Sequence, residues 1–489
     1  MVNRNLTKLP IGWAFVKVRD IADLISGQHI LAENYNDNND GIPYLTGPAD
    51  FSFKYPIISK WTTKPKAIAH KDDVLLTVKG AGVGKTNILN IDKAAISRQL
   101  MAVRGAVLNH HYLFYYFDFL FHIFQEMGAG STVPGIDRES ILNFQIFLPP
   151  LNEQHRIVAK IEELFSDLDA GVEALKKAKA QLKLYRQAVL KAAFGGRLTA
   201  AWREAHKEEL EPASVILERI RGESKKAGQV SHKEFLIDVS TLHSLPEKWE
   251  WVSLGELIDS MQNGIYKPRE FYSRDGVACL RMYNIENGEI VWKDIKRMIL
   301  SKEEIAQYEL KVGDILINRV NSRELVGKAA VIPVNLEKCV YESKNIRMRL
   351  KTNYTESKYV NYWLRLFGQG YFNMNAQQVV GMASINQQQI SAMPVPFTNS
   401  FEQYQIVGEV DFHFSIMDSM EKGIDKGIVQ AGRLRQAILK KAFTGKLVPK
   451  DPEDEPAAEW LKRIKKEKTG HPDRKKPGRS AIQRDLNYG

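Results

Sequence analysis

One glycine-rich stretch carries residue types that could hold a phosphate. Residues 79–86 read Lys-Gly-Ala-Gly-Val-Gly-Lys-Thr and end like a nucleotide-binding loop. Such a loop requires a glycine five positions before the glycine of its Gly-Lys pair, so that backbone amides wrap the phosphates. Lys79 stands at that position, and residues 87–92 indicate a strand and turn rather than a helix. We favour a hairpin loop whose amides and lysines approach nucleic-acid phosphates. A nucleotide site that uses Lys85 and a plain structural turn stay as alternatives.

The patterns that would carry catalysis are missing. A methyltransferase acting on adenine requires an Asn/Asp-Pro-Pro-aromatic motif, and Leu148-Pro149-Pro150-Leu151 has neither the polar residue nor the aromatic one. Pro472-Asp473 is not followed by the Glu-x-Lys of a nuclease. The 11 histidines show no metal-ligand spacing. We therefore expect no catalytic residue, no metal site and no cofactor on this chain.

The charge of the chain indicates a polyanionic partner. Its 489 residues carry a formal net charge of +11, which favours nucleic acid over a membrane. The most apolar run, Leu113–Phe124, is too short to span a bilayer and contains Asp118 and His122. Cys279 and Cys339 are too few for a disulfide framework and fit a reducing cytoplasm. No signal peptide is predicted at the start.

Candidate DNA-reading residues lie in loops where basic, amide and aromatic side chains gather, because Arg, Lys, Asn and Gln read base edges. In the first half they are Gln28, His29, Tyr44, Thr46, Lys79, Lys85 and Arg98. In the second half they are Tyr266, Lys267, Arg269, Arg281, Tyr283, Asn284, Arg319, Asn321, Arg323 and Lys328, with further amides at 377–378 and 387–389. Lys176, Lys177, Lys179 and Lys183 form a basic face that either contacts DNA or is simply solvated.

These residues belong to a chain that repeats itself. Residues 153–198 align with 402–447 without a gap, and 18 of the 46 pairs are identical, which indicates a duplication. Leu9-Pro10-Ile11-Gly12-Trp13 returns as Leu245-Pro246-Glu247-Lys248-Trp249, and Gly84-Lys85 returns as Gly327-Lys328. The offset drifts upstream and stays at 249 downstream. Each half is therefore predicted to be a variable domain followed by a helix of constant length.

The constant segments carry a heptad pattern, which predicts two long coiled-coil helices. The seam residues are Ile157, Ile161, Leu164, Leu168, Leu175, Leu182, Val189, Ile406, Val410, Met417, Ile424, Leu434 and Ile438. Small residues such as Gly171 and Gly427 would let the two backbones approach. If the helices of one chain pair with each other, an antiparallel arrangement is natural. Packing of each helix on its own domain is the alternative.

The predicted architecture is α+β, with two similar globular domains separated by two long antiparallel coiled-coil helices in a pseudo-two-fold repeat. The predicted segments are a first domain at 1–150, a helix at 151–198, a linker with a short helix at 199–244, a second domain at 245–399, a helix at 400–447, and a short helix with a basic tail at 448–489. We expect the basic tail to be disordered over Lys462–Arg479.

The duplicated motifs resemble the DNA specificity subunit of type I restriction-modification systems. The similarity rests on the Leu-Pro-x-x-Trp opening, the Gly-Lys loop, residues 149–158 at the helix entrance and Arg-Gln-Ala-Val/Ile-Leu-Lys at its exit. It covers nearly the whole chain, in duplicate. Gln405 stands where the entrance usually has Arg, and His413 and Lys441 lie on the second seam.

The resemblance implies two target-recognition domains that each read one half of a bipartite, asymmetric DNA sequence, and two helices that act as a ruler for the spacer. It also implies two modification (methyltransferase) subunits and two restriction/motor subunits as partners, on which S-adenosylmethionine, ATP and Mg are expected. The subunit itself would be a non-catalytic, cytoplasmic protein that binds double-stranded DNA and no membrane. The alternatives are the specificity subunit of a fused restriction-methylation enzyme, a coiled-coil scaffold that binds no DNA, and a P-loop enzyme.

Overall fold

The structure is a computed structural model of the chain and describes residues 9–105, 108–129, 134–228, 235–379 and 381–469. The chain divides into two compact units. The first combines residues 1–175 with 426–489, and the second is the intervening stretch 176–425. Each unit holds one globular domain and part of both long helices. No helix in the described ranges combines the length and the apolar character that a bilayer crossing requires.

The first domain has two four-stranded sheets and a strand pair. Their orders are β2-β9-β6-β7, β4-β3-β8-β5 and β1-β10. The strands are β1 (Ala14–Lys17), β2 (Ala22–Ser26), β3 (Ile42–Leu45), β4 (Trp61–Thr62), β5 (Ile68–His70), β6 (Val74–Thr77), β7 (Thr86–Ile88), β8 (Lys93–Ile96), β9 (Leu100–Gly105) and β10 (Gln145–Leu148). The helices are α1 (Val18–Ile21), α2 (His110–Phe119), α3 (Phe121–Gly128) and α4 (Arg138–Leu142).

The second domain repeats this plan. The sheet β12-β22-β18-β20 has the strand order of β2-β9-β6-β7, and β11-β25 corresponds to β1-β10. These strands are β11 (Glu250–Ser253), β12 (Ile258–Asn263), β18 (Ile315–Asn318), β20 (Ala329–Val331), β22 (Asn345–Leu350) and β25 (Pro394–Phe397). A second sheet, β13-β17-β14-β21, comprises Tyr272–Ser273, Lys296–Met298, Val277–Leu280 and Cys339–Tyr341. The smaller strands are β15 (Ile285–Glu286), β16 (Glu289–Ile290), β19 (Val320–Asn321), β23 (Gln377–Val379) and β24 (Met382–Ser384).

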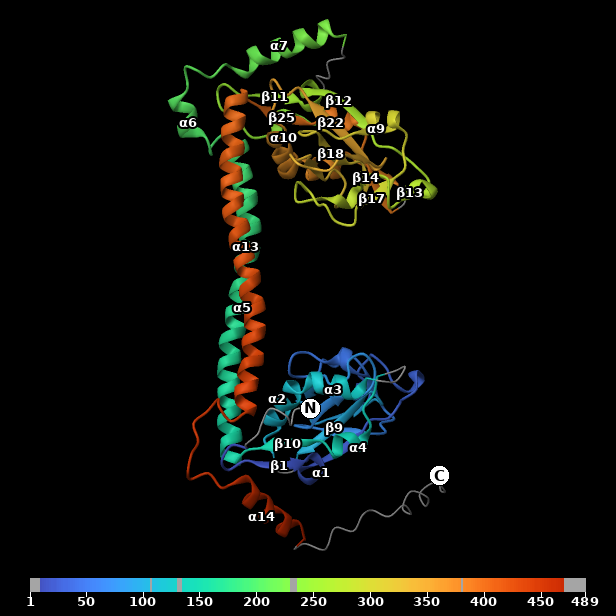
Figure 1. The fold of residues 1–489 in the computed structure, drawn as a ribbon, viewed down its shortest axis with the longest axis vertical. Coiled ribbons are helices and arrows are strands. Elements are labelled where there is room, and N and C mark those ends of the chain that lie inside the picture. Colours follow the sequence, from blue (N-terminus) through green and yellow to red (C-terminus); the bar gives the residue numbers. More distant parts are fainter. Residues whose placement is uncertain (1–8, 106–107, 130–133, 229–234, 380, 470–489) are drawn as a thin grey trace. The chain divides into compact units, whose positions relative to one another are not determined.

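The helices of the second domain follow the same pattern. They are α8 (Leu254–Leu257), α9 (Lys302–Tyr308), α10 (Ser357–Trp363), α11 (Gln369–Asn375) and α12 (Gln387–Ser391). Between α10 and α11 lies a π-helical turn, Leu364–Gly368. The two similar α+β domains that the repeat predicted are thus confirmed (Figure 1).

Strand β6 shows why the core has layers. Its side chains alternate between faces, as in any strand. Val74 and Leu76 join the core that contains the aromatic helix α2, whereas Leu75 joins the core under the second sheet. A strand buried on both faces carries a continuous apolar run, and the equivalent strand β18 does the same with Ile315, Leu316 and Ile317.

Both domains are attached to a long helix by the same hydrogen bond. Trp13 Nε1–H donates to Glu153 Oε2 (3.0 Å), and Trp249 Nε1–H donates to Glu402 Oε2 (2.8 Å). Both carboxylates are 1% exposed. Each also receives a cation from a segment that follows a long helix, Lys450 for Glu153 and Arg203 for Glu402. These buried charges are therefore paired, as burial requires.

The long helices α5 (Leu151–Phe194) and α13 (Ser400–Phe443) have 44 residues each, or about 66 Å. Figure 1 shows them side by side. In the first unit Asp169 pairs with Arg435, and in the second Lys179 pairs with Asp425 (2.7 Å) and Arg186 with Asp418. As the residue number on α5 rises, the residue number of its partner on α13 falls. The two helices therefore run antiparallel within each unit.

Burial along the seam is uneven. Ile157, Ile161, Val189, Ile406, Val410 and Met417 are buried, and Leu164, Leu168, Leu175, Leu182, Ile424 and Ile438 are partly buried. The prediction for Leu434 is wrong, since it is 44% exposed. Its neighbour Arg435 packs inward instead, with its guanidinium carbon 4.5 Å from the centre of the Phe165 ring.

The two glycines expected at a close approach also differ. A Cβ on Gly427 would lie 3.1 Å from Leu175 Cδ1, whereas nothing lies within 4 Å of a Cβ on Gly171. Close approach of the backbones is therefore supported at Gly427 and not at Gly171.

The segment that follows each long helix contacts the domain at the far end of that helix, close to the first residues of that domain. Helices α6 (Ala200–Ala205) and α7 (Ala213–Lys226) belong to the second unit, and α14 (Ala457–Thr469) belongs to the first. The Ala213 N–H donates to the Lys248 carbonyl (3.0 Å), and the Ala457 N–H donates to the Gly12 carbonyl (2.9 Å). Residues 462–469 continue α14, which corrects the prediction of disorder there; residues 470–489 lie outside the described ranges.

Candidate nucleic-acid interface

The first domain brings Lys79 and Arg98 together in one open cleft. Its volume is about 430 Å³, and its lining is Lys79, Gly80, Arg98, Gln99, Pro134 and Gly135. Lys79 follows β6, and Arg98 and Gln99 form the turn between β8 and β9. The Val78 N–H donates to the Gln99 carbonyl (2.8 Å), which holds the two loops together. Because all three polar side chains are exposed, they can offer cationic and amide donors to phosphates or base edges.

The second domain has the corresponding backbone contact with different side chains. The Arg319 N–H donates to the Lys344 carbonyl (2.8 Å), and the Ile385 N–H donates to the Arg319 carbonyl (2.9 Å). Beside them the sheet β19-β24-β23 carries the exposed Gln377. Two residues here, Gln99 and Lys344, were missed at the sequence level. Gln99 directly precedes strand β9, and Lys344 directly precedes the equivalent strand β22. The drifting offset between the two halves concealed this correspondence.

The Gly-Lys pair closes a hairpin in both domains. The Thr77 N–H donates to the Lys85 carbonyl (2.8 Å), and the Asn318 N–H donates to the Lys328 carbonyl (2.7 Å). Thr86 then begins strand β7, whereas a nucleotide-binding loop leads into a helix. The surroundings of the loop therefore favour the hairpin and weaken the nucleotide alternative. Lys85 is exposed at the turn.

Three of the predicted DNA-reading residues are buried and cannot reach a base. Tyr44 is 3% exposed in a small core under β3. The Asn284 side chain donates to the carbonyls of Val291 and Lys293 (3.1 and 2.9 Å), which closes the loop around β15 and β16. The Asn321 amide donates to Asn318 (2.8 Å) in a buried chain of amides. Amides do read bases, but buried ones satisfy internal groups first.

Other candidates are engaged but accessible. Lys267 pairs with Glu304 (2.6 Å), and Arg281 pairs with Glu342 (3.0 Å) while its guanidinium lies over Tyr283. The Thr46 hydroxyl donates to Asp50 (2.9 Å). The remaining candidates are exposed: Gln28, His29, Tyr266, Arg269, Tyr283 and Arg323. Their contact with DNA stays a prediction.

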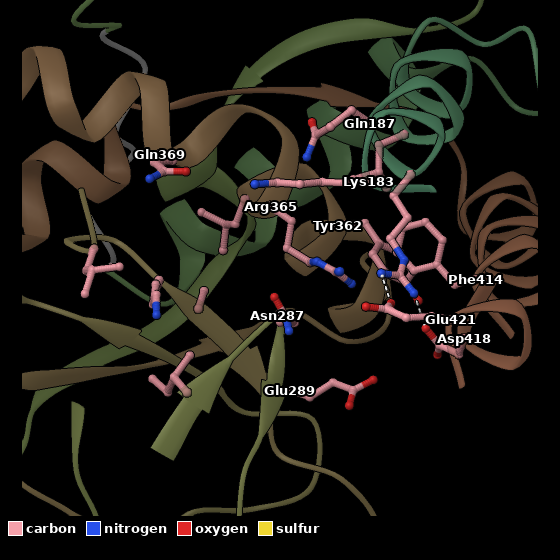
Figure 2. A pocket seen from close by; sticks show the side chains of 18 of the residues that line it. Lys183, Gln187, Asn287, Glu289, Tyr362, Arg365, Gln369, Phe414, Asp418 and Glu421 are labelled. Carbon is pink, nitrogen blue, oxygen red and sulfur yellow. Dashed lines mark hydrogen bonds and ion pairs between the residues drawn. The ribbon is translucent and has the colours of Figure 1, made fainter. Parts of the chain in front are cut away.

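A larger cleft of about 970 Å³ lies inside the second unit (Figure 2). It is lined by α5, α13, the β15–β16 hairpin, the π-helical turn and the loop that carries Lys328. Lys176, Lys179 and Lys183 of α5 line it, so three of the four predicted helix lysines face this cleft. Lys179 is held by Asp425 and Glu421 (2.7 and 3.4 Å). Figure 2 shows the side chains of Lys183 and Arg365 extending into the space.

The described residues offer no cluster of three or more His, Cys, Asp or Glu side chains suited to a metal ion. Cys279 and Cys339 are buried and unpaired. Burial raises the pKa of both thiols to about 12, with further contributions from nearby carboxylates. Thiols with such pKa values are poor nucleophiles at neutral pH.

Comparison with known proteins gives a consistent result. The family described as type I restriction modification DNA specificity domain matches residues 10–183 and 246–428. The EcoDI specificity subunit of Escherichia coli is 24% identical over 94% of this chain and 96% of its own length. The StySPI specificity subunit of Salmonella potsdam is 25% identical over 95% and 97%. A solved chain of a type I R-M system is 19% identical and has a TM-score of 0.65, covering 90% of this chain and all of its own.

Proposed function

The chain belongs to the type I restriction-modification DNA specificity family, and from this we infer that it is the DNA-recognition subunit of such a system. We propose that each domain reads one half of a bipartite, asymmetric target. The observation that carries this proposal is the duplicated attachment: two domains with one strand order are fixed by the same Trp–Glu hydrogen bond to two paired helices. Their reading loops differ, as two different half-sites require.

The proposed reading surface is the cleft around Lys79 and Arg98 in the first domain and its counterpart around Arg319 and Lys344 in the second. These positions share a backbone frame and differ in side chains. Direct reading of bases uses accessible cationic and amide groups, whereas phosphate contacts fix register. The paired helices α5 and α13 would set the spacer length between the half-sites.

Because the matching family is described as a DNA specificity domain, we propose that partner subunits carry the chemistry. Two modification subunits would supply S-adenosylmethionine-dependent methylation, and two motor subunits would supply ATP-driven restriction with Mg. The chain itself would hold no cofactor and would act in the cytoplasm on double-stranded DNA. This division of labour is supported by the family, whose DNA specificity domain matches each half of the chain.

Methylome sequencing tests the proposal. Cells that express the modification partner with this chain should methylate one bipartite adenine motif, and cells that lack the chain should not. A variant with Lys79→Ala and Arg98→Ala should weaken methylation or relax the half-site read by the first domain while keeping the other half-site. An unchanged motif in cells without the chain would refute the specificity role.

A further inference from the structure

An arginine without an anionic partner projects into the cleft of the second unit. Arg365 lies in the π-helical turn Leu364–Gly368, and such turns often occur at functional sites. Its guanidinium carbon lies 5.6 Å from the centre of the Tyr362 ring and 4.9 Å from that of Phe414. No hydrogen bond or ion pair joins its guanidinium to any described residue. Burial lowers the pKa of its guanidinium.

The duplicated position in the first unit has the opposite charge. The aromatic pair Tyr362–Phe414, edge to face at 5.5 Å, corresponds to Tyr115–Phe165, edge to face at 5.7 Å. Three residues after Tyr115 stands Asp118, where the second unit has Arg365. Both units therefore keep the edge-to-face aromatic pair, but the charged side chain three residues after its tyrosine has the opposite sign.

The long helix facing this position carries an arginine in both units, so its charge is not reversed. Burial raises the pKa of Asp118, and the charge of Arg435 in the first unit opposes that shift. Arg435 corresponds to Arg186 of the second unit. Arg186 is held by Glu421 (2.9 Å) and by Asp418, and its charge disfavours that of Arg365. The first unit therefore places an acid near its arginine, whereas the second places a second arginine there.

The walls of the cleft leave room for the Arg365 side chain and add further donors. Gly288 (φ +82°) lies against it, since a Cβ there would come within 2.4 Å of Arg365 Cδ. Asn287 and Gly288 both have positive φ, which is typical of an Asn-Gly hairpin turn. The other cationic and amide side chains of the lining include Lys183, Gln187, Lys328 and Gln369. Glu289 and Glu324 also line the cleft, and Glu289 favours the charged form of Arg365 without pairing with it.

We propose that Arg365, together with Lys183 and Lys328, binds a phosphate of the DNA backbone, so that the second domain has an anchoring contact that the first domain lacks. The inference rests on the proposed function, because DNA is the polyanion that this family recognises. A guanidinium suits a phosphate since its planar fork can donate two hydrogen bonds at once. A backbone phosphate is the same in every sequence, so the contact would add affinity without selecting bases.

Salt titration of DNA binding tests the assignment on the full-length chain in its assembled complex. In Arg365→Met the apolar length of the side chain remains and the charge is lost. We expect the slope of log K against log salt to fall by about 1, as for one lost phosphate contact. Affinity for target and non-target duplexes should fall by the same factor. Arg365→Lys should keep most of the slope, and Asp118→Asn, at the duplicated position, should leave it unchanged.

Other outcomes would overturn the proposal. An unchanged slope with weaker binding and a lower melting temperature would assign Arg365 to packing against Tyr362 and Phe414. A changed ratio of target to non-target affinity would assign it to base reading. Micromolar binding of inorganic phosphate or ATP without DNA, lost in Arg365→Met, would assign the cleft to a free anion. If the wild-type complex shows no preference for a bipartite target, the proposed function itself fails. If the wild-type complex prefers such a target and Arg365→Met binds DNA with the same affinity and salt slope, only the anchoring contact fails.

Discussion

Gly84 and Gly327 explain at the level of single residues why a Gly-Lys pair occurs in both halves. Both have positive φ, at +89° and +81°. A Cβ on Gly84 would lie 2.9 Å from the Phe121 carbonyl oxygen, and a Cβ on Gly327 would lie 2.1 Å from Phe372 Cδ2. The turn thus presses on an aromatic helix in both domains. Here the glycines serve close packing of the hairpin, and the lysine beside each is left at the surface or at the wall of a cleft.

Alanine at Gly80 and at Gly84 separates conformational strain from packing. Both glycines have φ +89°, but nothing lies within 4 Å of a Cβ on Gly80. Gly80→Ala should therefore cost only the left-handed strain, about 1–2 kcal/mol. Gly84→Ala should add an overpacking cost and reach about 2–4 kcal/mol. Hydrogen exchange of the β6 and β7 amides measures the local opening free energy. Equal losses in the two variants would show that packing against α3 is unimportant.

The candidate site shows what residue type can and cannot reveal. Lys79 and Arg98 were found because exposed cations in turns are recognisable from sequence. Asn284 and Asn321 have side chains of an equally suitable type, yet both amides donate hydrogen bonds to carbonyl oxygens inside the domain. Burial depends on contacts between segments far apart in sequence. Arg365 was missed for the same reason, since only the folded unit shows that its guanidinium lies in a cleft and forms no ion pair with a described residue.

The long helices were predictable as elements because a heptad pattern is local. Antiparallel pairing was natural only if the two helices of one chain paired with each other, and the ion pairs within each unit show that direction. The exact seam does not follow from the pattern. Arg435 turns inward because Asp169 neutralises it and the Phe165 ring covers its guanidinium, and Leu434 is left exposed as a result. A heptad rule that counts only apolar side chains cannot anticipate an arginine that packs through its flat face.

The two mid-helix glycines should respond differently to alanine. Glycine costs a helix about 1 kcal/mol relative to alanine. Gly171→Ala should recover most of this, because a Cβ there meets nothing within 4 Å. Gly427→Ala should gain less or nothing, since its Cβ would lie 3.1 Å from Leu175 Cδ1. The midpoints of thermal unfolding of the two variants give the comparison. A larger gain for Gly427→Ala would show that the helices are not close at this point.

Each unit of the whole molecule is assembled from segments that are distant in sequence. The domain at the start of one long helix is met by the end of the other helix and by the segment that follows it. Gly196 and Gly445, both at φ +68°, end the two helices and lie against Pro246 and Pro10 of the domains they reach. A change in the length of one helix alone would therefore move its end away from the domain it must contact.

Matched insertions in both helices test the proposed ruler. Seven residues added after Leu175 and seven after Asp425 keep the heptad phase and lengthen the pair by about 10 Å. That distance is about three base pairs, and it rotates one half-site about the DNA axis by roughly 100°. Three heptads in each helix add about 31 Å, close to one DNA turn. We expect the triple insertion to lengthen the methylated spacer by roughly 9–10 base pairs while both half-sites stay the same.

The single-heptad variant should bind more weakly than the triple one, because its half-site has the wrong rotation about DNA. Insertion into α5 alone is the matched control. It would displace Asp169 from Arg435 or Arg186 from Asp418. The two ion pairs could then not form at the same time, and the helix pair should lose stability. Methylome sequencing gives the spacer directly. If matched insertions alter the half-sites and leave the spacer constant, the distance between half-sites is set by the domains, and α5 and α13 serve only to join them.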